Sequence, residues 1–230
     1  MTTSFIVLAP IAPDSIFMDE NGIKPAISAK ETEADSLDPF NKPRLRRAII
    51  LKALEACTKE ISFQTPPAQT DPLTTLYSNV HSKGLLEFLT TSWTSWVEIG
   101  DGRRNPGAEF PGSQGVIKPF IPINMPLPRE PYQRASKNVM GQIGYYCTDA
   151  CTPIVETLLQ ELMWDSSIIQ TAVEKAIDGA LVYAMPTHPG HHAAKDCFGG
   201  YCYLNQAAFA ARLFQSKHKL AKIAVLDIGK

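Results

Sequence analysis

Two kinds of apolar pattern alternate along this chain. Compact apolar runs predict buried strands at Phe5–Leu8, Ala180–Met185 and Lys222–Ile228. Apolar residues that recur every three or four positions predict helices instead. The first predicted helix begins at Pro43, and the next two cover Leu73–Val80 and Gly84–Trp96. A further helix begins at Thr152, with Pro153 in its first turn, and a separate one covers Ile168–Ile177 and ends at Gly179. The last predicted helix covers Leu204–Phe214.

The order of these elements near the end of the chain indicates the fold class. A strand at 180–185, a helix at 204–214 and a strand at 222–228 make a βαβ unit. Such a unit requires parallel strands with helices on the faces of the sheet. We therefore predict an α/β fold in which residues 1–230 form a single domain.

Two segments lack either pattern. Residues 13–41 are mixed and polar, which predicts a loop. Residues 100–141 are rich in proline and glycine, with seven prolines between Pro106 and Pro131. An irregular segment of this length is either a functional lid or binding loop or a plain surface loop, and the sequence leaves both interpretations open.

Composition and charge exclude some classes of protein. The chain has 230 residues and a formal net charge of −1, which gives no strong field for nucleic acid or an anionic membrane. No stretch approaches the ~18 apolar residues of a membrane-spanning helix. Five cysteines without even spacing favour reduced thiols inside the cell. We therefore predict a cytoplasmic or nuclear protein.

The candidate chemistry lies directly after the predicted strand 180–185. His191 and His192 are adjacent, and only histidine has an unperturbed pKa near neutral pH, which favours proton transfer. Gly200 lets the backbone approach a ligand closely, and Tyr201 offers an aromatic wall. Asp227 ends the next predicted strand, where its carboxylate would orient one imidazole. The alternative interpretation of the pair is a surface turn with two histidines, or one histidine that is buried and hydrogen-bonded.

The full motif is more specific than the pair. Pro189-Gly190-His191-His192-Ala193 followed by Gly199-Gly200-Tyr201-Cys202-Tyr203-Leu204-Asn205 resembles the histone deacetylase superfamily, and most of all its acetylpolyamine amidohydrolase-like branch. Upstream, the segments that resemble the same branch are Gly144–Asp149 with Thr152–Ile154, Val80–Ser82 with Leu86–Leu89, and Pro43-Arg44. The likeness extends from about residue 40 to the last residue.

The resemblance implies an arginase/deacetylase-like α/β fold and a Zn²⁺-dependent hydrolysis of acetyl amides. His192 would be general base and then general acid, and His191 would give electrostatic support. Gly200 and Tyr201 would contact the substrate, and Arg44 would lie at the inner end of its tunnel. The segment 100–141 would shape substrate access and the contacts of a homodimer.

The chain departs from the family where the zinc ligands are expected. Asp227 matches the first, non-ligand Asp of the family's Asp-x-Asp-x-His motif, Gly229 stands at the ligand Asp, and the ligand His would follow Lys230. His188 with the cysteines at 147 and 151, or 197 and 202, has no common zinc spacing, so free thiols are the preferred interpretation. We therefore predict a sheet that is incomplete at its C-terminal side, no zinc held by this chain, and no activity of the chain alone.

Two functional hypotheses remain open. The first is an enzyme of the deacetylase superfamily, of which the chain is an N-terminal portion. The second is a non-catalytic relative that uses the fold for binding or regulation. For the enzyme, acetylated polyamines are the first expected substrates and acetyl-lysine proteins the second, with neither a nucleic acid nor a membrane as partner.

Overall fold

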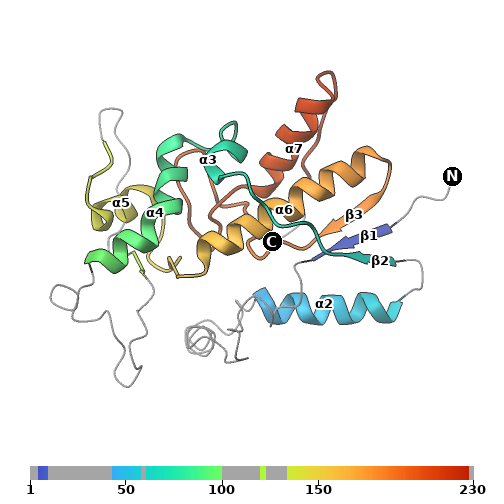
Figure 1. Ribbon diagram of the computed structural model, residues 1–230, viewed down its shortest axis with the longest axis horizontal. Coiled ribbons are helices and arrows are strands. Elements are labelled where there is room, and N and C mark those ends of the chain that lie inside the picture. The colour runs from blue at the N-terminus through green and yellow to red at the C-terminus, as the bar shows by residue number, and fades with distance from the viewer. Residues whose placement is uncertain (1–4, 10–42, 58–60, 100–119, 123–133, 228–230) are drawn as a thin grey trace.

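The computed structural model describes residues 5–9, 43–57, 61–99, 120–122 and 134–227. In chain order the elements are β1 (Phe5–Leu8), α2 (Pro43–Cys57), β2 (Ile61–Gln64), α3 (Leu73–Leu76), α4 (Lys83–Ile99), α5 (Val139–Tyr146), α6 (Leu158–Ile177), β3 (Leu181–Ala184) and α7 (Gln206–Lys217). Figure 1 shows the strands between α6 on one side and α2 on the other.

The three described strands form one parallel sheet in the order β2-β1-β3. Val7 in the central strand is level with Phe63 on one side and Tyr183 on the other. Because side chains alternate along a strand, Ile6 and Leu8 face the opposite way from Val7 and pack with Ile168 of α6. The parallel sheet with helices on both sides confirms the predicted α/β class.

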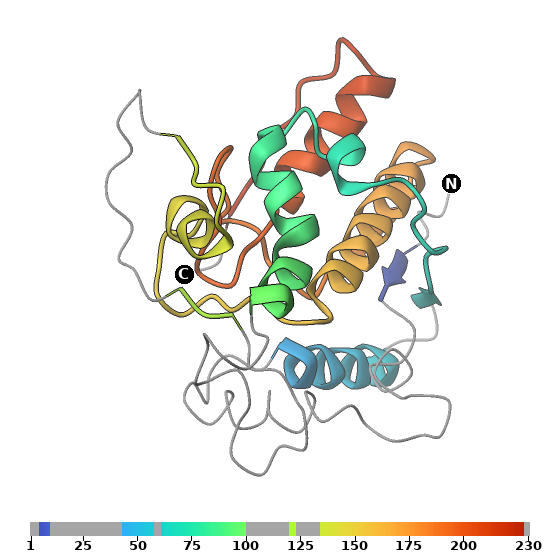
Figure 2. The same ribbon diagram turned by 60° about the vertical axis from the view of Figure 1, so that its left-hand side comes forward.

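A larger core lies away from the sheet, among the helices. Figure 2 shows α4 between α5 and α6, with α7 behind them. Phe88 of α4 stacks on Tyr146 of α5 and on Phe198, and Phe198 stacks in turn on Tyr203. Burying each such ring stabilises the fold by about 1.5–3 kcal/mol. Two of these rings, Phe198 and Tyr203, belong to the loop between β3 and α7. The core therefore fixes the segment that carries the candidate chemistry.

Several predicted elements are confirmed. They are β1, β3, α4, α7 and the start of α2 at Pro43, and Gly179 ends α6 with a φ of +91°. The helix expected at 73–80 is shorter, and α3 ends at Leu76. The sequence pattern gave no sign of β2 or α5, and α5 begins within the segment 100–141 that we expected to be irregular. No helix in the described ranges is long and apolar enough to cross a membrane.

The prediction of two helices over 152–177 is wrong. A single helix of 20 residues, α6, begins at Leu158. Thr152 does not cap it, because its hydroxyl donates to the Asp149 carboxylate and accepts from the Tyr201 N–H. Ile154 pairs with Phe120 in an isolated antiparallel bridge. The Thr-Pro pair is therefore used to hold a turn of the candidate site.

The strand predicted at 222–228 is also wrong over its described part. Residues 222–227 follow the last turn of α7 without strand pairing, and their side chains are exposed. Val225 is 63% exposed and Leu226 is 84% exposed. An apolar run forms a buried strand only beside a partner strand, and β1 is the one described partner of β3. The predicted βαβ unit over 180–228 is therefore not formed by the described residues.

Candidate active site

The loop between β3 and α7 brings the candidate residues together. Its turn at Gly190 has a φ of +96°, which favours glycine. A Cβ at this position would lie 2.6 Å from the Leu204 carbonyl oxygen and 2.8 Å from the Gln206 nitrogen. The Gly190 N–H donates to the Cys202 sulfur at 3.2 Å. The turn before the histidines is thus packed against the residues that start α7.

His191 and His192 are adjacent in space as well as in sequence. Their ring centroids are 4.3 Å apart, the rings are inclined by 54°, and both residues are exposed. The His192 ring lies against Gly200, and a Cβ at that glycine would overlap the ring. Exposure allows both imidazoles to exchange protons with a bound molecule. The structure therefore brings together His191, His192 and Gly200 of the predicted site.

Asp149 holds the turn on which His192 rests. Its carboxylate accepts from the Gly200 N–H, from the Cys151 and Thr152 N–H groups at 2.8 and 2.7 Å, and from the Thr152 hydroxyl at 2.7 Å. Burial raises the pKa of Asp149, but these hydrogen bonds together outweigh it and lower the pKa to about 2. The carboxylate therefore stays ionised and keeps the turn fixed at neutral pH.

Tyr201 continues this turn in an unusual conformation. Its φ is 59°, next to a φ of 56° at Gly200, and it is the one described non-glycine residue with a positive φ. The left-handed region costs an L-residue about 1–2 kcal/mol. Because the Tyr201 N–H donates to the Thr152 hydroxyl, the surrounding contacts impose this conformation. Strain of this kind is typical of functional sites.

His81 closes the base of the loop. The ring accepts at Nε2 from the Asn205 N–H at 2.9 Å, so Nδ1 carries the proton that it donates to the Ala194 carbonyl at 2.8 Å. Burial lowers the pKa of His81, and the backbone hydrogen bonds oppose that change only in part. A neutral His81 therefore ties the two ends of the loop 194–205. Sequence reasoning missed this role, although His81 lies in a motif that resembles the family.

Two predicted site residues, Arg44 and Asp227, are not tested by the described contacts. Arg44 is the second residue of α2, and its side chain lies outside the described residues. Asp227 is exposed in the segment that follows α7. Its role in orienting an imidazole therefore stays a prediction.

The cysteines near the site are thiols. Cys147, Cys197 and Cys202 are free, and burial raises the pKa of Cys147 to about 12. Among the described residues, no group of three or more His, Cys, Asp or Glu side chains is placed to hold a metal ion. A catalytic zinc ion needs three protein ligands, and the family resemblance places the expected ones at 229 and beyond, outside the described residues, so the absence of zinc stays a prediction.

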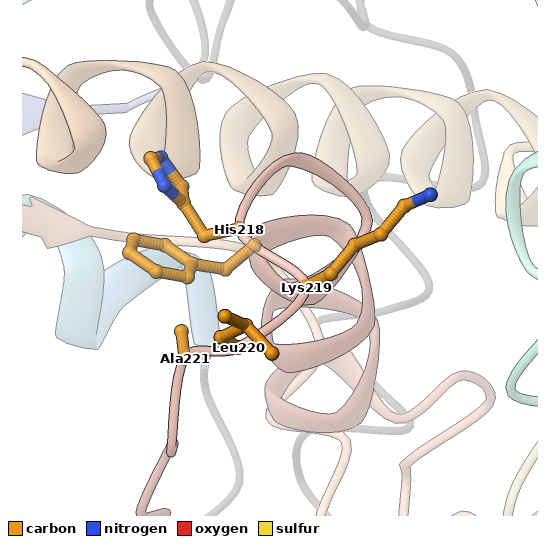
Figure 3. Close-up of a pocket in the computed structure, with 5 residues that line it drawn as sticks. His218, Lys219, Leu220 and Ala221 are labelled. Carbon is orange, nitrogen blue, oxygen red and sulfur yellow. The ribbon is translucent and has the colours of Figure 1, made fainter.

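An open hollow on the described surface lies elsewhere. Phe214, His218, Lys219, Leu220 and Ala221 surround a space of about 580 Å³. Figure 3 labels four of these residues, His218 to Ala221. These residues lie at the C-terminal end of α7, whereas the histidine loop precedes its N-terminal end. The two ends of a 12-residue helix are about 18 Å apart. This hollow is therefore not part of the candidate active site.

The parallel sheet, the covering helices and the imidazole pair on the loop after β3 define an α/β protein of the arginase/deacetylase-like class. The chain belongs to the histone deacetylase family, because the sequence profile of the histone deacetylase domain matches residues 38–229. The resemblance drawn from the motifs is thereby confirmed.

Relatives support the same assignment. The chain is 34% identical over 200 residues to an acetylpolyamine amidohydrolase of Mycoplana ramosa. The aligned region covers 83% of this chain and 50% of that protein. It is 31% identical over 150 residues to acetylpolyamine amidohydrolase 2 of Pseudomonas aeruginosa, covering 65% of this chain and 39% of the relative. The chain thus spans half or less of the length of these relatives.

A solved structure shows the same fold. The crystal structure of an acetylpolyamine aminohydrolase from Burkholderia pseudomallei, from an iodide soak, matches with a TM-score of 0.56 at 23% identity. The match covers 93% of this chain and 53% of that chain. At this identity the likeness establishes the fold alone.

Proposed function

We propose that this chain carries the proton-transfer half of a deacetylase centre that hydrolyses acetylated polyamines. The observation that carries the proposal is the exposed His191–His192 pair, with the His192 ring resting on Gly200. The family assignment and the names of the relatives support amide hydrolysis. Acetyl-lysine in proteins is the second substrate class.

Each residue of the pair has its own part in the proposed reaction. His192 takes a proton from the attacking water and then gives it to the nitrogen of the leaving amine as the C–N bond breaks. His191, with its ring centroid 4.3 Å away, stabilises the charge that develops during this transfer. Tyr201 forms a wall beside the substrate, and Arg44 lies at the inner end of its tunnel. Acetate and the free amine are the products.

The metal belongs to a different part of the proposal. In the family a zinc ion would polarise the acetyl carbonyl. The described residues hold no suitable ligand set, and Gly229 stands where the resemblance places a ligand Asp. We therefore propose that these 230 residues by themselves hold no zinc and do not turn over substrate.

An assay of a full-length clone tests the enzymatic proposal. Acetylspermidine and an acetyl-lysine peptide are offered to the natural sequence, to His192→Ala and to His218→Ala, whose histidine lies in the hollow at the far end of α7. Loss of a general base lowers turnover by about 10²–10⁴-fold, so we expect this loss for His192→Ala alone. Equal turnover of the two variants would show that His192 is not the base.

A second candidate function is binding without catalysis. The observations that favour it are Gly229 and the lack of a metal-holding cluster in the described part of the chain. Calorimetry with acetylspermidine on the 230-residue chain, followed by analysis for released acetate, distinguishes the two. Heat of binding without acetate supports the binding relative, and acetate release contradicts it.

Light scattering on the same sample tests the homodimer proposed through 100–141.

A further inference from the structure

Three residues before the histidine pair, the same loop directs a histidine into the interior. His188 is 9% exposed, and its ring lies edge-on to Tyr203 with the centroids 4.9 Å apart. Its Nδ1 lies 2.9 Å from the Asp165 carboxylate and its Nε2 lies 3.3 Å from the Glu161 carboxylate. Both carboxylates come from α6, one helical turn apart. Nothing in the proposed reaction uses these side chains.

The geometry favours a doubly protonated ring. A neutral imidazole has one N–H, so one of its nitrogens would direct a lone pair at a carboxylate oxygen. Asp165 is fully buried and accepts two backbone N–H groups in addition to the ring. Glu161 lies in the first turn of α6, where the helix dipole favours a negative charge, and accepts from the Thr157 hydroxyl.

Two phenols also lie at the cluster. Tyr203 of the loop faces the ring, and Tyr77, next to α3, lies close enough to Asp165 for the carboxylate to oppose its ionisation. Burial raises the pKa of both tyrosines, so both stay neutral at pH 7. Neither phenol therefore adds a charge to the cluster.

The same contacts fix the backbone of the loop. Asp165 accepts from the Thr187 N–H at 2.6 Å, from the His188 N–H at 3.1 Å and from the His188 ring. Only Pro189, whose φ is restricted, and Gly190 separate His188 from His191. The position of α6 is thereby transmitted directly to the turn that carries the pair.

We propose that His188, held as an imidazolium between Glu161 and Asp165, is a positioning residue that sets the His191–His192 turn on α6. The effect of His188 on catalysis rests on the proposed function, whereas its position between the two carboxylates does not. A buried ion pair is weak grounds for stability, because desolvation offsets the attraction between the charges. Three hydrogen bonds that one carboxylate accepts from two consecutive residues instead specify a geometry.

Nuclear magnetic resonance of the imidazoles tests the placement on the 230-residue chain. The chain has five histidines, so their ring signals are separable. We expect the His188 ring to carry both protons from pH 5 to pH 8. In Asp165→Asn we expect the ring signals of His191 and His192 to move. The matched control is Glu174→Gln on the same helix, which removes an exposed ion pair with Lys217 and leaves those signals in place.

Two results would overturn the proposal. One is a His188 ring that loses a proton near pH 6.5 in the natural sequence. The other is a pair of His191 and His192 signals that are the same in Asp165→Asn and in Glu174→Gln. If Asp165→Asn does not fold, Glu161→Gln decides, because it leaves all three bonds to Asp165 in place. There we expect His188 to lose its Nε2 proton, and a ring that stays doubly protonated contradicts the proposal.

A kinetic measurement separates this inference from the proposed function. In a full-length clone that hydrolyses acetylspermidine, misplacing the pair lowers kcat by about a hundredfold with little change in KM. An unchanged kcat in Asp165→Asn contradicts positioning. A natural sequence without turnover contradicts the proposed function and leaves the magnetic resonance result to decide the placement.

Discussion

Gly200 and Gly179 show how one residue type serves two purposes. Both have a positive φ, 56° at Gly200 and 91° at Gly179, so an alanine at either position is strained. At Gly179 an added Cβ meets nothing within 4 Å, whereas at Gly200 it would meet the His192 ring. Backbone conformation alone explains Gly179, and Gly200 is also required by the ring that rests on it.

This pair gives a prediction at the residue scale. Gly200→Ala and Gly179→Ala each lower the free energy of unfolding by about 1 kcal/mol through backbone strain. Only Gly200→Ala displaces the His192 ring, so only that variant shifts its magnetic resonance signals. Urea denaturation and histidine spectra measure the two effects. Equal spectra for the two variants would mean that Gly200 does not seat the ring.

Tyr201 gives a second prediction at this scale. Truncation to alanine and truncation to glycine remove the same aromatic contacts, but glycine adopts a φ of 59° without a steric penalty. We expect Tyr201→Gly to be about 1 kcal/mol more stable than Tyr201→Ala. Tyr145 in α5 is the control, because in a helix alanine is the better residue and the order of the two variants reverses. The comparison is made from urea midpoints.

At the scale of elements, the local pattern of apolar residues predicted those strands and helices whose formation depends on local contacts. The apolar runs of β1 and β3 and the periodic stripes of α4 and α7 each identified an element without knowledge of its neighbours. The break expected within α6 is absent because tertiary contacts bury both parts of one helix. The start expected at Thr152 is absent because its hydroxyl is used by Asp149, three residues earlier, and by Tyr201, 49 residues later.

In the candidate site, too, the sequence predicted the residues of one local motif and missed those that meet through contacts between elements. The motif from Pro189 to Asn205 identified His191, His192, Gly200 and Tyr201. It could not identify the cluster around His188, because both carboxylates lie on α6. It also gave no role to His81, whose two partners belong to the opposite ends of another loop. Contacts between elements carry no signal in a single sequence.

His81 leads to a prediction about the loop that it closes. Its pKa in the folded state is below the ordinary 6.5, so the folded state binds fewer protons than the unfolded chain. The stability that His81 contributes is therefore complete above about pH 6.5 and is lost as the pH falls below that value toward the folded-state pKa. Urea denaturation between pH 7.5 and pH 5 should show this slope.

His81→Gln removes the titration, so its stability should depend less on pH across this range. His218→Gln removes an exposed histidine and should keep the slope of the natural sequence. A steep slope that persists in His81→Gln would assign it to another group. Asp149 acts in a separate window, because its pKa of about 2 makes its contribution fall only as the pH drops below about 3.8.

At the scale of the whole molecule, the apolar surface is covered unevenly. The helical core around Phe88 and Phe198 is buried on all sides. In contrast, β3 presents Leu181 at 61% exposure, and Val225 and Leu226 are exposed beyond α7. In the described sheet β3 pairs on one edge with β1. An apolar strand edge is a template for association with another chain.

We therefore expect the 230-residue chain to self-associate as its concentration rises, through β3 and the segment 222–227. A charge in an exposed apolar run opposes such association, so Val225→Lys should keep the chain monomeric to higher concentration in light scattering. Ile49→Lys is the matched control, because Ile49 is 59% exposed on α2 and belongs neither to β3 nor to that segment. If Ile49→Lys and Val225→Lys act equally, net charge and not this edge controls association. If neither acts, association through 100–141 becomes the better explanation of any dimer that is observed.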